Sequence, residues 1–173
     1  MNKLLATLTL GLLFTTSLHA ADNPGPLTIE LTEPGARIIV PGMAGIEMKE
    51  HPMRESEPMF LLRGETEETM VSIMTPPLES EITPIACASA VANSLLALGH
   101  VKRNEIFLGR SNDQTFLIIY GVPMEQAVML NTHIVSSVDS TQCIEAHVSH
   151  ISTDQGDIEP WFTGFGDSNI ETY

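Results

Sequence analysis

The chain has 173 residues, of which 22 are acidic and 8 are basic, so its formal net charge at pH 7 is −14. This length is typical of one domain and is enough to bury an apolar core. Such a surface is a poor match for nucleic acid or an anionic membrane, whereas a basic protein or a cation would suit it. Solubility alone is the alternative reason for the acidity.

The first twenty residues have the three-part pattern of a secretory signal peptide. Lys3 supplies a positive charge, residues 4–14 are mostly apolar, and the segment ends in the small residue Ala20. The apolar run is shorter than the roughly 20 residues that span a bilayer. We therefore expect cleavage after residue 20 and a single globular domain over residues 21–173. We also expect a periplasmic location without membrane insertion, with secretion beyond the periplasm as the alternative.

The N-terminal half of this domain is expected to be rich in strands. Alternating apolar residues and turn signals predict the following segments. These are strands at 27–31 and 36–40, an edge segment at 46–50, a polar loop at 51–58, and strands at 59–63 and 69–74 around an acidic turn at 64–68.

One long helix is expected over residues 83–99. Thr83 is a good N-cap, Pro84 suits the first helical position, and Gly99 is a typical terminator. The apolar residues that share one face of this helix should pack on a sheet. They are Cys87, Ala88, Val91, Leu95 and Leu98.

The C-terminal half returns to strands. Those expected are 104–109, 115–120, 130–137 and 142–151. Segment 115–120 is the most apolar and is expected to be central, and the last two strands should form a hairpin around 138–141. An acidic loop at 152–160 and a short helix or tail at 161–173 complete the chain. The order indicates an α+β fold, in which one long and one short C-terminal helix pack on an antiparallel sheet.

The chain has two cysteines, Cys87 and Cys143. In an oxidising compartment an even pair is most simply a disulfide, which would stabilise the fold by roughly 3–4 kcal/mol. The alternative uses Cys87, in the first turn of the helix, as the nucleophile of a cell-envelope Cys–His hydrolase. His133, His147 or His150 would then supply the base.

The histidines and one acidic loop suggest two further interpretations. His147 and His150 are three apart on a strand and point to opposite faces, so they cannot share a metal ion, whereas His133 and His147 can pair across the hairpin. Asp154, Asp157 and Glu159 surround a glycine turn that could bind Ca²⁺ or simply be solvated. We predict no bound cofactor.

Acidic residues are concentrated between positions 47 and 68 and are interleaved with Met53, Met59 and Met70. Methionine-rich surfaces adapt readily to partners, and acidic loops complement basic grooves. We therefore predict a partner-binding surface for a basic protein. Its residues are Glu55, Glu57, Glu65, Glu67, Glu68, Asp154, Asp157 and Glu159.

The order of elements resembles the Mog1/PsbP-like α/β/α sandwich. The segments that carry the likeness are 59–74, 83–99, 104–120 and 143–151, followed by Trp161. This resemblance implies a non-enzymatic binding domain, and some exported proteins of this kind act as toxin-immunity proteins. The motifs G-x-S-x-G, S-x-x-K, HExxH, C-x-x-C and the P-loop are absent, so the enzyme class stays open but is the less favoured one.

Overall fold

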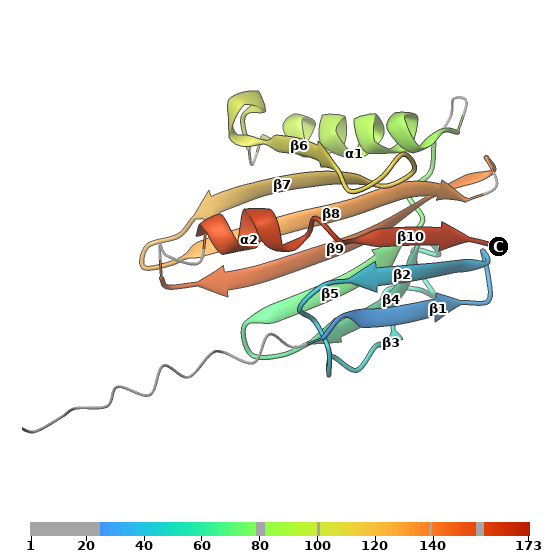
Figure 1. Ribbon diagram of the computed structural model, residues 1–173, viewed down its shortest axis with the longest axis horizontal. Helices are drawn as coiled ribbons and strands as arrows, with labels where there is room; N and C mark the ends of the chain where they lie inside the picture. The colour runs from blue at the N-terminus through green and yellow to red at the C-terminus, as the bar shows by residue number, and fades with distance from the viewer. Residues whose placement is uncertain (1–24, 79–81, 100, 139, 155–157) are drawn as a thin grey trace, which may run out of the picture.

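The computed structural model describes residues 25–78, 82–99, 101–138, 140–154 and 158–173. Within these ranges the chain forms two antiparallel sheets, one long helix α1 and one short helix α2 (Figure 1). The α+β class is confirmed. The expected signal peptide lies outside the described residues. No helix in the part of the chain that the structure describes is long and apolar enough to cross a bilayer.

The larger sheet has seven strands in the order β3-β4-β5-β9-β8-β7-β6, and each adjacent pair is antiparallel. The strands are β3 (Lys49–Glu50), β4 (Phe60–Glu65), β5 (Thr69–Met74), β6 (Phe107–Arg110), β7 (Phe116–Pro123), β8 (Val128–Val138) and β9 (Gln142–Ser152). The hairpin expected around 138–141 is present as β8 and β9, with His133 opposite His147. Residues 115–120, the most apolar segment, were expected to form the central strand. They lie in β7, which is next to the edge strand β6, and the central strand is β9.

The smaller sheet has the order β1-β2-β10, with β1 (Leu27–Leu31), β2 (Ala36–Val40) and β10 (Asn169–Thr172). The first two strands have the expected bounds, because their alternate residues face the core. The expectation for residues 161–173 was incomplete, since α2 (Ile158–Gly164) is followed by β10. This strand is short, and Ile170 is its only buried apolar residue, so it shows little alternation in the sequence.

The main core lies between the two sheets. We call the side of the large sheet that packs there its inner face, and it carries Val71, Ile73, Ile119, Ile134 and Val148. Helix α2 covers part of the same face, where Trp161 and Phe162 pack against the core and Phe165 is buried within it. We call the opposite side the helix face, because α1 (Pro84–Leu98) lies on it (Figure 1).

Helix α1 begins and ends as expected. The Thr83 hydroxyl accepts a hydrogen bond from the backbone N–H of Ala86 at 3.2 Å, and Gly99 ends the helix in the left-handed conformation with φ 73°. Burial decreases along its apolar face, from Cys87 at 0 % exposed to Leu98 at 66 %. The expectation that Leu98 packs on the sheet was wrong. The helical spacing correctly predicts which residues share a face, but that face is exposed to solvent in the last turn.

Two expected strand segments differ in type as well as in bounds, whereas the bounds of β4, β7 and β8 differ from expectation by one to three residues. Only Lys49–Glu50 of segment 46–50 pairs as a strand, because the preceding residues cross over Gly64, where a Cβ atom would lie 2.6 Å from Cγ2 of Ile46. The segment expected as a strand at 104–109 begins as a 3-10 turn, Arg103–Glu105, before β6. In both cases alternation in a short polar segment does not distinguish a strand from a turn.

Candidate functional site

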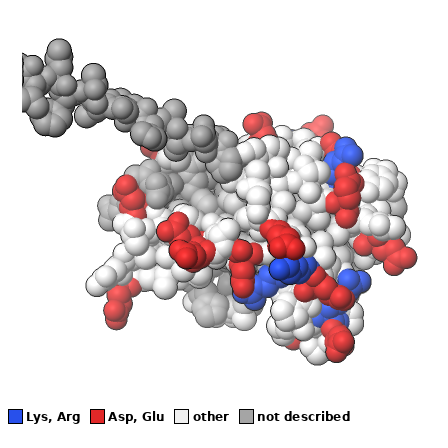
Figure 2. All heavy atoms as spheres, turned by 90° about the horizontal axis from the view of Figure 1, so that it is seen from below, with Lys and Arg blue, Asp and Glu red and all other residues white. Residues whose placement is uncertain are grey.

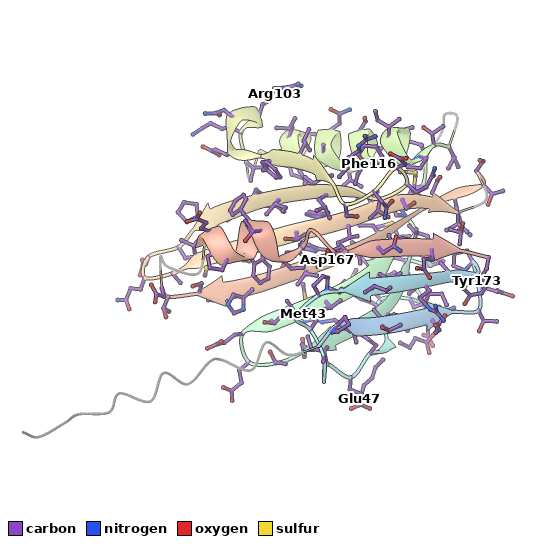
Figure 3. The ribbon with its side chains drawn as sticks, in the orientation of Figure 1. Met43, Glu47, Arg103, Phe116, Asp167 and Tyr173 are labelled. Atoms are coloured by element: carbon purple, nitrogen blue, oxygen red, sulfur yellow. A yellow bond between two sulfur atoms is a disulfide. The ribbon has the colours of Figure 1, made fainter. Side chains whose placement is uncertain are left out.

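Cys87 and Cys143 form the expected disulfide, with their Cα atoms 5.5 Å apart. Both residues are buried, and the bond attaches the first turn of α1 to the start of β9. Phe116 lies between α1 and the sheet in this region (Figure 3). No free cysteine is present in the described ranges. Cys87 therefore carries no thiolate that could attack a substrate, as the hydrolase alternative requires.

Acidic side chains from several segments meet at one end of the large sheet. The backbone N–H of Ile151 donates to the carbonyl of Glu68 at 2.9 Å, so the β4–β5 turn lies beside the end of β9. Val128 pairs with Ser152, which brings the β7–β8 turn to the same end. The ring of Trp161 in helix α2 stacks on His150, which brings the start of α2 to this end as well. We call this region the acidic end, and its exposed acidic residues are Glu65, Glu67, Glu68, Glu125, Asp154 and Glu159.

Few basic groups neutralise the acidic end. Glu65 pairs with Arg63, at 2.6 Å between Oε2 and Nη2. Glu67, Glu68, Glu125 and Glu159 form no ion pair with any described residue. In Figure 2 the basic side chains in view lie against acidic ones, and at the left of the view acidic side chains are visible and basic ones are not.

The acidic end also has apolar and concave parts. Met124 is 51 % exposed and Ile151 is 43 % exposed. A cavity of about 410 Å³ lies between residues 123–128, around the β7–β8 turn, and residues 152–154, at the end of β9. The region therefore combines negative charge with exposed apolar side chains and a hollow, as protein-binding surfaces do.

Two of the predicted partner-binding residues lie elsewhere. Glu55 and Glu57 are in the loop before β4, and Met59 at the end of this loop accepts a hydrogen bond from Thr75, just after β5. They therefore lie beyond the opposite end of β4 from Glu65, and a six-residue strand is roughly 20 Å long. The structure does not bring them together with the acidic end. Asp157 lies outside the described residues.

A buried polar cluster occupies the helix face beside α1. The rings of His133 and His147 stack with centroids 4.2 Å apart, as the expected cross-strand pairing requires. Nδ1 of His133 lies 2.6 Å from Oε1 of Glu145, and its Nε2 lies 3.2 Å from the hydroxyl of Tyr120. Because a carboxylate only accepts, Nδ1 of His133 carries a proton and donates it.

The second histidine of the cluster has a different set of partners. Oδ1 of Asn131 accepts from the Ser149 hydroxyl at 2.8 Å and lies 3.1 Å from Nε2 of His147, which fits a proton on Nε2. Burial, reinforced by the nearby His133, lowers the pKa of His147 well below its usual value of 6.5. His147 is therefore neutral at pH 7.

The chemistry available to this cluster is limited by burial. Burial and the negative charge of Glu145 raise the pKa of Tyr120 to about 12, so its hydroxyl keeps its proton. Tyr120, His133 and Glu145 are each at most 6 % exposed, so a substrate cannot reach them in this conformation. The cluster is an internal hydrogen-bond network that links β7, β8 and β9.

His150 belongs to the other face, as its spacing from His147 predicts. Its ring stacks on Trp161 of α2 at 5.2 Å, and its Nδ1 lies 2.9 Å from the Thr69 hydroxyl. No three histidine, cysteine or acidic side chains of the described ranges are grouped as ligands for a metal ion. The acidic loop for which Ca²⁺ binding was one alternative includes residues 155–157, which are outside those ranges.

No protein-family model matches the chain, and no curated protein matches its sequence.

Sequence reasoning missed Glu125 at the acidic end and Tyr120, Asn131 and Glu145 in the buried cluster. The cluster had a usable signal, since polar residues alternate at 131 and 133 and again at 145, 147 and 149. With the hairpin register known, these positions fall on one face. Glu125 had no such signal, because its position depends on the pairing of β8 with β9.

Proposed function

We propose that this protein is exported to the periplasm and acts there as a binding module for a basic surface of another protein. The observation that carries this proposal is the acidic end, where separate segments present six exposed acidic residues with Met124 and Ile151. Complementary charge would speed the encounter, and the exposed apolar side chains would be buried in the complex.

The N-terminal pattern and the disulfide support export. Disulfides are common in oxidising compartments and rare in the cytosol. Toxin immunity is the specific role that the resemblance to Mog1/PsbP-like domains suggests. In that role the acidic end would cover a basic active cleft and exclude the toxin's substrate.

The test compares three forms of the mature protein as baits for envelope extracts of the producing and competing bacteria. They are the wild type, the acidic-end variant Glu67→Lys/Glu68→Lys/Glu125→Lys, and the control variant Glu55→Lys/Glu57→Lys. We expect one stoichiometric basic protein bound by the wild type and the control. The acidic-end variant should lose at least about tenfold in association rate, measured at low salt.

Two results would contradict the proposal. One is that no protein is retained at low or moderate salt. The other is that both variants bind the recovered protein with the same rate and salt dependence as the wild type, which would move the contact surface away from the acidic end. Circular dichroism spectra of all three proteins check that charge reversal leaves the fold intact.

A further inference from the structure

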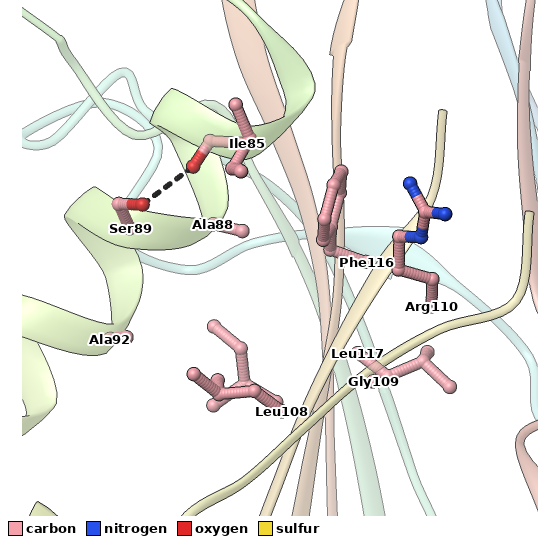
Figure 4. A pocket seen from close by; sticks show the side chains of 10 residues that line it. Ile85, Ala88, Ser89, Ala92, Leu108, Gly109, Arg110, Phe116 and Leu117 are labelled. Carbon is pink, nitrogen blue, oxygen red and sulfur yellow. Dashed lines mark hydrogen bonds between the residues drawn. The ribbon is translucent and has the colours of Figure 1, made fainter. Parts of the chain in front are cut away.

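The helix face contains an apolar groove at its free edge, between α1 and the edge strand β6. Helix α1 contacts β8 and β7 most closely, so it does not cover β6. The groove has a volume of about 540 Å³, within the range of small-molecule sites. Figure 4 shows Ile85, Ala88 and Ala92 on the helix side, with Leu108 and Phe116 opposite.

Small side chains on the helix keep this groove open. Ile85, Ala88, Ser89 and Ala92 are spaced at i, i+3, i+4 and i+7, and they form one stripe along α1. The Ser89 hydroxyl donates to the carbonyl of Ile85 at 2.7 Å, so it is already satisfied within the helix. The wall that α1 presents to a ligand is therefore effectively apolar.

Two large apolar side chains at the rim are exposed to solvent. Ile85 is 62 % exposed and Leu108 is 64 % exposed. Covering apolar surface of this kind favours binding, because it removes that surface from water. The groove thus favours an apolar ligand over a polar one.

One charged residue lines the groove, and it is a cation. Arg110 projects beside the ring of Phe116, with Cζ 5.9 Å from the ring centroid (Figure 4). Its only ion pair among described residues is with Asp113, at 3.8 Å, and both side chains are largely exposed. Such a pair is weak, so an incoming anion can replace it. No lining residue is acidic, in a chain where acidic residues greatly outnumber basic ones.

We propose that this groove binds an aliphatic carboxylate, a free fatty acid of medium chain length. The hydrocarbon chain lies between α1 and Leu108, over Phe116 and Ile118, and the carboxylate pairs with the guanidinium of Arg110. Arginine suits this role because its planar donors match the two carboxylate oxygens. The site is separate from the acidic end and does not depend on the function proposed above.

The test uses decanoate below its micellar concentration, with 1-decanol as a probe that has the same chain and no charge. Binding is followed by ¹⁵N–¹H NMR, because the amides of Ala88, Ala92, Gly109 and Phe116 report on the groove. We expect saturable shifts at these amides with decanoate. Arg110→Gln should lower the affinity for decanoate about tenfold, which corresponds to the loss of one charged hydrogen bond. The affinity for decanol should not change.

A matched pair of helix variants tests the location. Ala92→Leu fills the groove and should abolish both ligands' shifts, whereas Ala97→Leu adds the same bulk at an exposed position outside the groove and should change nothing. If Ala92→Leu does not fold, Ser89→Leu, at an exposed position on the same wall, replaces it. Circular dichroism and thermal unfolding verify each variant.

Three outcomes would overturn the proposal. One is the absence of saturable shifts at the groove with decanoate. Another is that Arg110→Gln lowers the affinities for decanoate and decanol equally, which would mean that the carboxylate is not recognised. The third is that the chemical shifts of the groove amides change with protein concentration in the absence of ligand. This would identify the occupant as a second copy of the chain.

Discussion

The two faces of the seven-stranded sheet are built differently. The inner face packs against a second sheet and α2, and its largest side chains, such as Ile73, Ile119 and Ile134, are fully buried. The helix face is covered by one helix, of which only Cys87, Ala88 and Val91 are buried. A disulfide, a polar cluster and an open groove occupy the rest of that face.

This difference indicates a division of roles. The inner face supplies most of the apolar burial, which is the main favourable term in folding. The helix face has less apolar contact and relies on a covalent link and hydrogen bonds to hold α1 and to join its strands. A face that contributes less to stability can keep a groove and a polar cluster at a lower cost to the fold.

The largest expected effect compares two neighbouring isoleucines of β7. Ile119 faces the second sheet and Ile118 faces α1, and both are 0 % exposed. We expect Ile119→Ala to lower the free energy of unfolding by about 4 kcal/mol, because the cavity would be enclosed between two sheets. Ile118→Ala should cost about 2–3 kcal/mol, because Ile118 lines the open groove and its cavity can join it.

Urea unfolding of the two variants measures this difference directly. The slopes of the two transitions must agree for the comparison of stabilities to be valid. If the two variants lose equal stability, or if Ile118→Ala loses more, the helix face is packed at least as tightly as the inner face.

The next effect concerns the disulfide. The double variant Cys87→Ala/Cys143→Ala removes a link between residues 56 positions apart and should lower the free energy of unfolding by about 3–4 kcal/mol. Because the bond attaches α1 to β9, the amides of α1 should lose more protection from hydrogen exchange than those of β5. An equal loss of protection in α1 and β5 would mean that the disulfide stabilises the whole domain and has no special role in holding α1.

Local rules predicted much of this fold. The bounds of β1, β2 and β5 follow from alternation, and those of α1 follow from Thr83, Pro84 and Gly99. The second sheet was not predicted, because it depends on the pairing of β2 with β10 across most of the chain. Strand pairing over such a distance has no local signal in a single sequence.

The candidate sites show the same limit. The disulfide and the His133–His147 pair followed from residue type and hairpin register. The acidic residues were recognised by composition, but the sequence could not show that Glu55 and Glu67 lie at different ends of β4. Nor could it show the groove, which exists because α1 stops short of β6 and carries small side chains there.

The smallest effect is a pH dependence specific to the helix face. The pKa of His147 is lowered in the folded protein, so below the unfolded value of about 6.5 the unfolded state binds more protons at this residue. This contribution to the free energy of unfolding is therefore constant above pH 6.5 and decreases as the pH falls below it. The slope cannot exceed about 1.4 kcal/mol per pH unit, which corresponds to one proton.

His147→Gln should flatten the pH dependence of the free energy of unfolding just below pH 6.5. His150→Gln, on the inner face, controls for the loss of a histidine as such. His133 stacks on His147, and Glu145 and Tyr120 contact His133. All three remain in both variants, so the difference between the two slopes isolates residue 147. Because burial lowers the pKa of His147, its ring resonance in the folded protein should not titrate near pH 6.5. Titration near 6.5 would mean that water reaches this ring, and the helix face would then be open where the structure has it closed.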